Sequence, residues 1–406
     1  MANVSSSNGL EKRPALSFRD DCGREFPSWH RTTLGTIIEP YSEKVHGEHD
    51  FEVLTSSREG LQRQIDHFGS QQRHDTDGYN IIPLGFCTYR NRSDDGRFTF
   101  NINKISDKAI VSKFYPVFRF KNANSTFMTE YLNSSARARK KLSVLAVGTS
   151  QVVLSFEALK SAKFDLPCKE EQDKIASLLE CLNERVELQR SFVDALKKYK
   201  RGAVRSLLSE KSCSLKNASW TTAKMGELGC FIKGAPLSKA DISEDGTPFI
   251  LYGELYTTYN EVITSVKRRT QAQVDEIFLS RVGDVVIPTS GETPEEISTA
   301  SCVMLPDVIL AGDLNIFRGD KVDGRIMSYL LNHVVNAKIA RIAQGKSVVH
   351  VQASELCKLT LTYPDKNTQH AIIEFLSKLD DKITNEENAL TFMSDLKEGM
   401  MQQLFI

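Results

Sequence analysis

The sequence predicts an α+β fold, in which two mixed α/β domains in a pseudo-twofold arrangement are separated by two long antiparallel helices that form a coiled coil. Three observations lead to this prediction. The chain has 406 residues, more than one hydrophobic core usually holds. One long segment occurs twice without a gap. In both copies, apolar residues recur at spacings of three and four, the pattern of a helix that packs on another helix.

The composition is that of a soluble globular protein, with 40% hydrophobic and 26% charged residues. No apolar run approaches the roughly 18 residues that span a bilayer. Lysine plus arginine and aspartate plus glutamate each total 52, so the net charge does not indicate a polyanionic partner. The eight cysteines form no CxxC pair and the N-terminal stretch has no signal-like apolar core, which predicts reduced thiols and a cytoplasmic protein.

The repeat pairs residues at a constant offset of 197, so that Pro167 matches Pro364 and Gln172 matches Gln369. Near the start of each half, "WHRTTLGTI" and "WTTAKMGEL" contain the only two tryptophans and match at an offset of 191. Between these stretches and the helices, the sequences show no convincing alignment. The two halves therefore share a frame and differ in content.

The repeat divides the chain into five expected segments. They are an N-terminal tail (1–20), a first mixed domain (21–160), a first helix (163–210), a second mixed domain (214–358) and a second helix (361–406). β-branched and aromatic residues between turn formers predict strands inside the mixed domains. These strands are expected at 98–102, 109–120, 247–252 and 284–288, and helices are expected at 60–68 and 325–343.

The two long helices are the clearest prediction. Roughly 40 residues at 1.5 Å per residue give a rod of about 60 Å. A single apolar stripe of this kind is typical of a core helix or a homodimerising coiled coil, but two equal copies favour pairing within one chain. The residues expected to dock the helices on each other or on partners are Ile175, Leu179, Leu182, Val186, Leu196, Ile372, Leu376, Leu379, Ile383 and Met393.

The stretch "ARIAQGKSVVHV" contains a Gly-Lys-Ser that resembles the end of a phosphate-binding loop. Such a loop needs a glycine five positions earlier, where this chain has Ala340. The matching position of Lys346 in the other half is Thr149, so the shared feature is a turn. Other catalytic and metal-binding motifs are missing as well. We therefore predict no catalytic, cofactor-binding or metal-binding residues in this chain.

Positive charge is concentrated in one region. Residues 86–141 contain twelve basic and four acidic residues. Such a surplus is compatible with an ordinary solvated face and also with a footprint for nucleic acid.

The stretch "FDLPCKEEQDKIASLLECLNERVELQ" resembles the conserved region of the specificity subunits of type I restriction-modification systems. The second copy keeps Pro364, Gln369 and Ile372 but has Thr368 where the first has Glu171. The stretches "AIVSKFYPVFRF", "FILYGELYTTYNEVI" and "GDVVIPTSGETPEEIS" are similar to the recognition domains of that family. The resemblance covers nearly the whole chain from about Trp29.

This resemblance implies a DNA-reading subunit without catalytic activity. Two target recognition domains would each read one half of a bipartite sequence, and the two helices would set the spacer. The partners implied are double-stranded DNA, two adenine methyltransferase subunits that bring S-adenosylmethionine, and restriction subunits that translocate DNA and use ATP and Mg. The target adenine would be flipped from the stack by the methyltransferase partner.

Candidate DNA-binding residues follow from base-edge readout by polar side chains and phosphate contacts by lysine and arginine. In the first domain, the loops expected to read bases carry Arg90, Arg92, Arg97, Asn101 and Lys113. Arg137, Arg139 and Lys140 are expected to contact the phosphate backbone. In the second domain they are Lys233, Lys239, Tyr256, Lys267, Arg268, Arg269, Ser290, Thr293 and Lys346.

Two other hypotheses stay open at this point. The repeated helices would also suit a pseudo-symmetric adaptor that does not bind DNA. A nucleotide-dependent enzyme would centre on Lys346. Each candidate DNA contact is also compatible with an ordinary surface charge, and no motif encodes the DNA sequence recognised.

Overall fold

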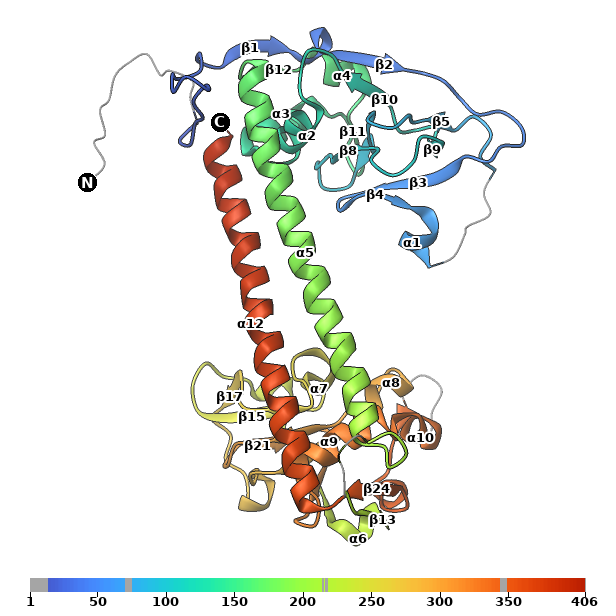
Figure 1. Ribbon diagram of the computed structural model, residues 1–406, viewed down its shortest axis with the longest axis vertical. Helices are drawn as coiled ribbons and strands as arrows, with labels where there is room; N and C mark the ends of the chain where they lie inside the picture. Colours follow the sequence, from blue (N-terminus) through green and yellow to red (C-terminus); the bar gives the residue numbers. More distant parts are fainter. Residues whose placement is uncertain (1–13, 70–74, 214, 216–217, 344–348, 406) are drawn as a thin grey trace, which may run out of the picture. The chain divides into compact units, whose positions relative to one another are not determined.

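The computed structural model describes the chain except for residues 1–13, 70–74, 214, 216–217, 344–348 and 406 (Figure 1). The chain divides into two compact units. Unit 1 comprises Met1–Arg190 and Asn388–Ile406, and unit 2 comprises Ser191–Glu387. Each unit therefore combines one α/β region with one part of each long helix. No helix in the described part of the chain has both the length and the apolar character needed to cross a bilayer.

Unit 1 is built on two four-stranded sheets. The first, in spatial order, consists of β2 (Ile38–Tyr41), β10 (Val117–Phe120), β6 (Cys87–Tyr89) and β8 (Phe100–Ile102). The second consists of β4 (Gly60–Arg63), β3 (Glu52–Ser57), β9 (Ala109–Val111) and β5 (Asn80–Ile81). Within the second sheet, β3 and β9 are parallel.

Short strands and helices complete unit 1. The paired strands are β1 (His30–Thr33) with β12 (Lys163–Leu166) and β7 (Arg92–Ser93) with β11 (Val152–Val153). The helices are η1 (Leu34–Thr36), α1 (Gln64–Phe68), α2 (Ser125–Ser134), α3 (Ala136–Leu145) and α4 (Phe156–Ser161). Trp29 lies in the core, and its ring meets the Phe127 ring edge-on at 6.1 Å.

Unit 2 has a five-stranded and a three-stranded sheet. The first consists of β14 (Cys230–Lys233), β22 (Leu314–Arg318), β18 (Asp284–Pro288), β20 (Ser301–Val303) and β16 (Val262–Ile263). The second consists of β17 (Arg268–Thr270), β15 (Thr247–Leu251) and β21 (Ile309–Ala311). The remaining strand pairs are β13 (Trp220–Lys224) with β24 (Thr360–Pro364) and β19 (Ser290–Gly291) with β23 (Val349–His350). The helices are α6 (Met225–Leu228), η2 (Lys239–Asp241), α7 (Glu254–Thr257), η3 (Glu276–Phe278), α8 (Pro294–Ile297), α9 (Gly324–His333), α10 (Asn336–Ile342) and α11 (Ala353–Cys357).

The order of strands shows that the repeat extends through the region where the sequences do not align. The order β2-β10-β6-β8 in unit 1 corresponds to β14-β22-β18-β20 in unit 2, and β4-β3-β9 corresponds to β17-β15-β21. The parallel pair β3 and β9 has its counterpart in the parallel pair β15 and β21. Unit 2 differs by its fifth strand, β16, which pairs in parallel with β20.

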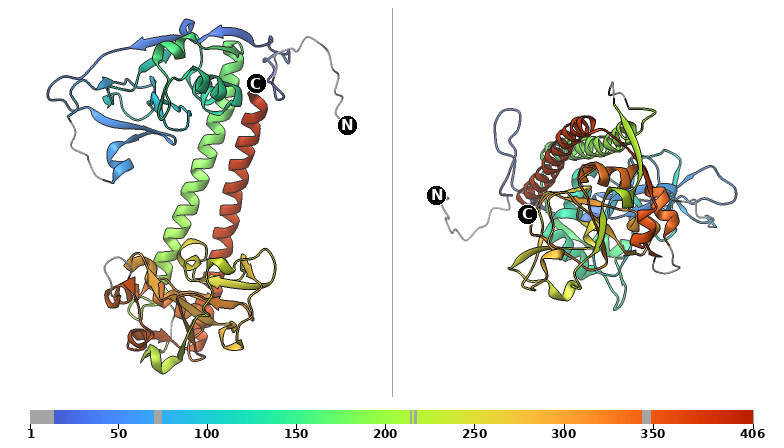
Figure 2. Two further views of the ribbon diagram at one scale, coloured as in Figure 1. Left: turned by 180° about the vertical axis from the view of Figure 1, so that it is seen from behind. Right: turned by 90° about the horizontal axis from the view of Figure 1, so that it is seen from below.

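The long helices are α5 (Lys169–Leu207) and α12 (Lys366–Leu404), with 39 residues each. In unit 1, Ile175 near the start of α5 shares a core with Leu404 at the end of α12. In unit 2, Val204 near the end of α5 shares a core with Ile372 near the start of α12. Within each unit the two helices therefore run antiparallel, side by side (Figure 1 and Figure 2). The predicted fold class is confirmed.

Five predicted elements need correction. The expected helix segments 163–210 and 361–406 each begin with strand residues, which belong to β12 and β24, and the helices themselves begin at Lys169 and Lys366. In the expected helix 60–68, the first four residues form β4, because they pair with β3 from Ser57 to Leu54. The expected strand 109–120 is two strands, β9 and β10. They are separated by a turn closed by the Tyr115 N–H and the Ser112 carbonyl, followed by Pro116, which has no N–H for a ladder. The expected helix 325–343 is divided into α9 and α10 at the β-branched pair Val334 and Val335.

Candidate DNA interface

Three predicted arginines of unit 1 meet at one small pocket of about 100 Å³. Arg90 follows the end of β6, Arg92 begins β7, and Arg97 lies in the connection to β8. Arg58 and the last two residues of β3, Ser56 and Ser57, complete one wall. All four guanidinium side chains belong to exposed residues. A cluster of this kind can donate paired hydrogen bonds to a phosphate or to the acceptor edge of guanine.

Asp95 orders one side of this arginine pocket. It accepts hydrogen bonds from Ser93 Oγ at 2.9 Å and from the Arg97 backbone N–H at 3.1 Å, and it forms an ion pair with Arg58 at 2.6 Å. These hydrogen bonds, with that of Ser93 the strongest, lower the pKa of Asp95 to about 2. Asp95 is therefore ionised at neutral pH and engages Arg58. Within the described residues, Arg90, Arg92 and Arg97 have no carboxylate partner.

Phe114 is an aromatic contact that the sequence interpretation missed. Its side chain is 51% exposed, the Arg92 guanidinium lies 5.1 Å from its ring centroid and the Lys113 ammonium lies 5.7 Å away. A cation held over an aromatic face is preorganised for an anionic or stacked ligand. The only signal in the sequence is an aromatic residue next to a lysine in a region rich in basic residues.

Asn101 has a different environment from the arginines. It is 7% exposed, and its side-chain amide donates to Ser56 Oγ at 2.8 Å and to the Ser57 carbonyl at 2.9 Å. These bonds tie β8 to the end of β3. In this structure Asn101 supports the pocket wall from inside and does not present its amide to solvent.

The predicted phosphate contacts lie on α3. Arg137, Arg139 and Lys140 are exposed on this helix, whose N-cap is the Ser135 side chain. Arg139 and Arg97 both line a second pocket of unit 1, of about 890 Å³. Arg137 and Lys140 therefore do not line the arginine pocket. Arg139 lies near it, because Arg139 shares the second pocket with Arg97, which lines both.

In unit 2, three predicted residues line one pocket of about 390 Å³. Lys239, Tyr256 and Arg268 share it with Glu254 and Asp313. Arg268 forms an ion pair with Glu254 at 2.9 Å. Burial, followed by the charge of Glu296, raises the pKa of Tyr256, so its hydroxyl stays protonated at neutral pH and can donate a hydrogen bond.

Ser290 does not line this pocket but contacts Asp313, which does. It is 6% exposed and donates to Asp313 Oδ2 at 2.9 Å. Ser290 occupies the position in unit 2 that Arg92 occupies in unit 1. Ser290 pairs with His350, and Arg92 pairs with Val153. The offset of the repeat relates Val153 to His350.

The other candidates of unit 2 are not brought together. Lys233 ends β14, Lys267 precedes β17, and Arg269 lies in β17, where its guanidinium donates to the Gly246 carbonyl at 2.8 Å. Thr293 is exposed at the start of α8 and accepts from the Glu296 backbone at 3.2 Å. Lys346 lies outside the described residues.

The predicted helix contacts fall into two groups. Those that are fully buried contribute to the cores of their own units, and the others are half-buried. The buried residues are Ile175, Leu179, Val186, Ile372, Leu376 and Ile383; the half-buried residues are Leu182, Leu196, Leu379 and Met393. Several large apolar side chains that were not predicted are exposed on the same helices. They are Leu188, Phe392 and Leu396 in unit 1, and Phe192, Tyr199 and Phe375 in unit 2.

The repeated Pro and Gln of the helix motif have a structural role that the sequence did not reveal. Gln172 Nε2 donates to the Pro167 carbonyl at 3.0 Å, and its Oε1 accepts from the Asn124 backbone N–H at 2.9 Å. In unit 2, Gln369 makes the same two bonds, to the Pro364 carbonyl at 2.8 Å and from the Asp323 N–H at 2.9 Å. Each buried glutamine thus fastens the start of a long helix to the N-cap of α2 or α9.

Metal binding finds no support in the described residues, where no three histidine, cysteine, aspartate or glutamate side chains form a group able to hold an ion. A buried charge cluster in unit 2, described below, is an internal ion-pair network.

Comparison with known proteins agrees with this architecture. The family model for the type I restriction modification DNA specificity domain matches residues 49–197 and again residues 217–391. Among curated proteins, none matches the chain by sequence.

Two solved structures are similar to the chain in fold. The S subunit of a type I restriction-modification system from M. genitalium has 15% sequence identity and a TM-score of 0.59, covering 97% of this chain and 99% of that one. A chain from a structural study of complex assembly and conformational transition of the type I R-M system has 16% identity and a TM-score of 0.56, covering 94% and 98%. The two family matches together span most of the sequence. The chain therefore belongs to the family of type I restriction modification DNA specificity domains.

Proposed function

We propose that this chain is the DNA-reading subunit of a type I restriction-modification complex, in which unit 1 reads one half of a bipartite target and unit 2 reads the other. The observation that carries this proposal is a pair of pockets at corresponding places with different chemistry. Both adjoin the carboxyl end of equivalent strands, β3 and β15. Four arginines and one carboxylate, Asp94, line the first, whereas one lysine, one arginine, two tyrosines and two carboxylates line the second.

Different pocket chemistry on one frame is what reading two different half-sites requires. Arginine prefers guanine acceptors, while carboxylates can accept from the cytosine amino group. The basic pocket also favours DNA over the alternative of an adaptor that does not bind DNA, because no feature of an adaptor needs unpaired guanidinium groups beside an exposed aromatic ring.

An exchange of recognition domains tests this proposal. Residues 21–160 would be replaced by the same region of a related subunit, and methylated adenines would be mapped in DNA from a host that carries the chain with its partners. We expect the half-site read by unit 1 to change and the other half-site to persist. A change in both half-sites, or in neither, would contradict the assignment.

For the assembly we propose two adenine methyltransferase subunits, which bring S-adenosylmethionine, and restriction subunits that use ATP and Mg. The chain itself would be non-catalytic. Exposed apolar residues lie on the long helices in both units, and two of them, Tyr199 and Leu396, are related by the offset of the repeat, which supports one docking surface in each unit. Native mass spectrometry of the assembled complex should find two methyltransferase copies, and one copy after Phe392→Asp.

We also propose that α5 sets the spacer between the half-sites. This helix is unbroken over 39 residues and passes from unit 1 into unit 2. Insertion of one helical turn after Lys198 should lengthen the spacer and leave both half-site sequences intact. An unchanged spacer would contradict this part of the proposal.

A further inference from the structure

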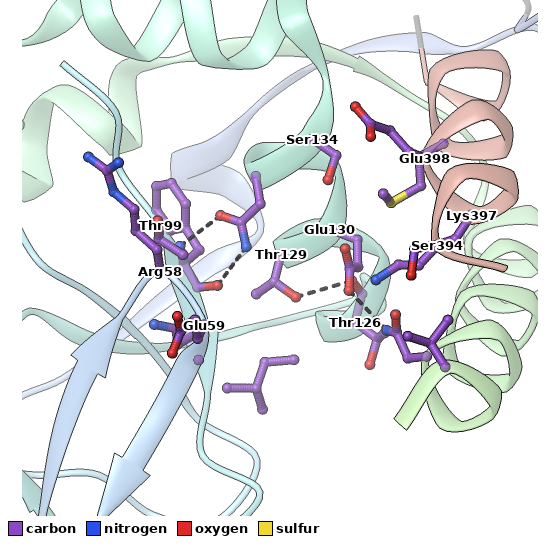
Figure 3. Close-up of a pocket in the computed structure, with 18 of the residues that line it drawn as sticks. Arg58, Glu59, Thr99, Thr126, Thr129, Glu130, Ser134, Ser394, Lys397 and Glu398 are labelled. Carbon is purple, nitrogen blue, oxygen red and sulfur yellow. Dashed lines mark hydrogen bonds between the residues drawn. The ribbon is translucent and has the colours of Figure 1, made fainter. Parts of the chain in front are cut away.

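A pocket of about 890 Å³ opens in unit 1 between the edge strand β8, helix α2 and the paired long helices (Figure 3). Thr126, Thr129 and Glu130 of α2 lie on one side, and Ser394 and Lys397 of α12 lie on another (Figure 3). Arg97 and Arg139, two candidate DNA contacts, line part of this pocket, but the recognition function proposed above gives no role to Ile102, Lys104 or Lys397.

In unit 2 the corresponding space is filled by the chain itself. Strand β16 runs parallel to β20, and the Cys302 N–H donates to the Glu261 carbonyl at 2.8 Å. The Met304 N–H donates to the Ile263 carbonyl at 2.9 Å. A short stretch around Glu261 thereby becomes the fifth strand of the sheet.

Matching side-chain bonds establish which residues correspond. Phe100 N–H donates to Asn133 Oδ1 at 2.8 Å, and Ala300 N–H donates to Asn332 Oδ1 at 3.1 Å. Each asparagine also donates back to the carbonyl of the same strand residue. Counting from these anchors, Ile102 of β8 takes the place of Cys302.

No described residue of unit 1 forms a strand on the outer edge of β8. In the described part of unit 1, β8 is the last strand of its sheet. Phe100 N–H points outward to α2, so the N–H of Ile102, two residues on, points the same way. Ile102 and Lys104 both line the pocket. An open edge of this kind is a template for an added strand.

The anchor of the unit 2 strand is an acidic side chain. Glu261 binds Lys200 at 2.8 Å and His333 at 2.6 Å, and Lys200 binds Asp380 at 2.6 Å. Lys200 lies on α5, and its side chain is nearly buried.

In unit 1 the matching lysine is Lys397, at the offset of the repeat. It lines the open pocket and has no ion pair among the described residues. Asn183 takes the place of Asp380 and donates to Glu130 at 3.2 Å. Unit 1 therefore keeps the lysine that binds the acidic strand in unit 2, with an asparagine in place of the second carboxylate. The described residues of unit 1 supply no strand at this position.

We propose that this pocket binds an extended peptide segment of a partner protein, which adds to the edge of β8 beside Ile102 and Lys104 and places a carboxylate on Lys397. Strand addition is a known mode of peptide recognition, with backbone bonds for affinity and side-chain pockets for specificity. Charge alone does not identify the ligand, because the lining combines four carboxylates with six basic residues, which are Arg58, Arg97, Lys104, Arg139, Arg190 and Lys397. The open strand edge favours a peptide, since backbone N–H and C=O groups in a row pair with another strand. The inference goes beyond the DNA-reading function and does not depend on it.

The test uses a synthetic peptide with the sequence of residues 258–266, TYNEVITSV, which contains β16, and the full-length chain. We expect saturable binding by fluorescence anisotropy and slower amide hydrogen exchange at Ile102 and Lys104. Lys397→Ala should weaken binding at least about tenfold, the effect expected for a lost hydrogen bond to a charged group. Lys397→Arg should retain most of the affinity. A peptide with glutamine in place of its glutamate should lose about as much as Lys397→Ala.

Five outcomes would overturn the proposal. Three concern the peptide: no saturable binding, binding that is insensitive to Lys397→Ala, and protection of amides other than those of β8. The fourth is equal weakening of duplex DNA binding by Lys397→Ala, which would assign the pocket to DNA. The fifth outcome concerns the identity of the ligand and uses a variant that lacks residues 1–13. If this variant binds the peptide much more tightly, the chain's own N-terminal tail competes for the pocket, and the natural ligand is not a partner protein.

Discussion

Two lysines at equivalent positions of the repeat, Lys200 and Lys397, have opposite environments in the two units. In unit 2, Lys200 is 8% exposed and lies between Glu261 and Asp380, with its ammonium 5.4 Å from the centroid of the Tyr329 ring. In unit 1, the matching Lys397 lines an open pocket. The repeated helix thus supplies the same residue twice, and its surroundings decide whether it becomes an internal anchor or a group available to a ligand.

The cause of this difference is the length of one connection. In unit 1, β3 and β4 form a tight hairpin in which Ser57 pairs with Gly60. In unit 2, the equivalent strands β15 and β17 are separated by residues 252–267, which contain α7 and β16. The longer connection covers the sheet edge and the helix pair, whereas the hairpin leaves both open.

Removal of the matched lysines should give the largest contrast. Lys200→Ala removes the cation from Glu261 and Asp380, whose side chains are 17% and 35% exposed. Breaking a fully buried ion pair costs about 3–5 kcal/mol, and the partial exposure of these carboxylates places the expected loss at the lower end of that range. Lys397→Ala should change the free energy of unfolding by less than about 0.5 kcal/mol.

Each unit contains one tryptophan, so the two effects can be measured separately. Trp29 reports on unit 1 and Trp220 on unit 2 in urea unfolding followed by fluorescence. Trp220→Phe and Trp29→Phe backgrounds would isolate each signal. Equal destabilisation by the two lysine variants would contradict the difference between the units.

The pH dependence should also separate the units. Burial raises the pKa of Glu261, but the hydrogen bond with His333 and the charge of Lys200 outweigh this and lower it to about 2. Because the folded pKa lies below the unfolded value of 4.5, the stabilisation is complete above pH 4.5 and is lost as the pH falls toward 2. For Glu261 alone this loss is on the order of 3 kcal/mol. Burial raises the pKa of Asp380, so protonation of Asp380 as the pH falls acts in the opposite direction and makes the net loss smaller.

The matched variant for this experiment is Glu261→Gln. It should be less stable than the wild type at neutral pH and should show a flatter dependence of the free energy of unfolding between pH 5 and pH 2, followed through Trp220. A wild-type acid profile that is unchanged in Glu261→Gln would rule out this carboxylate as the source.

The two glutamine anchors should behave alike, which tests the part of the frame that the units share. Gln172→Ala and Gln369→Ala each leave a backbone N–H and a proline carbonyl without partners. Each should destabilise its own unit by about 1–3 kcal/mol. Glutamate at either site would be a poor substitute because an ionised carboxylate cannot donate to the carbonyl. Unequal losses, measured through the tryptophan of each unit, would show that the anchors are not equivalent.

The smallest effects are expected for DNA binding, at Arg92 and Ser290, which occupy equivalent positions in the strand pairs β7–β11 and β19–β23. Arg92→Ala should weaken binding to DNA carrying the target by about tenfold and relax preference only in the half-site read by unit 1. Ser290→Ala, at the matching place, should act on the other half-site through the pocket residue Asp313. Arg119→Ala is the control, because Arg119 is already paired with Glu39 at 2.6 Å. Competition binding with half-site variants would measure all three, and a loss of preference in the wrong half-site would contradict the assignment.

The fold class followed from the sequence because helix periodicity and a gapless repeat are local signals. Apolar positions such as Ile175 and Ile372 repeat in register along the chain and predict a buried face without knowledge of its neighbours. The sequence also indicated the region of positive charge that contains Arg90, Arg92 and Arg97. Its limits show at Asn101 and Ser290, whose polar side chains are directed inward, to β3 and to Asp313.

By itself, the sequence determined the two-copy frame, the long helix pair and the concentration of basic residues in residues 86–141. Only the tertiary structure decided that the unaligned regions share one order of strands, that three of the arginines meet at one pocket, and that one lysine of a matched pair is enclosed while the other faces a pocket. The physical reason is that these features depend on contacts between segments far apart in the chain. For the two lysines, the length of the connection between β15 and β17 decides whether a strand covers the lysine, and no local pattern of residues predicts this contact.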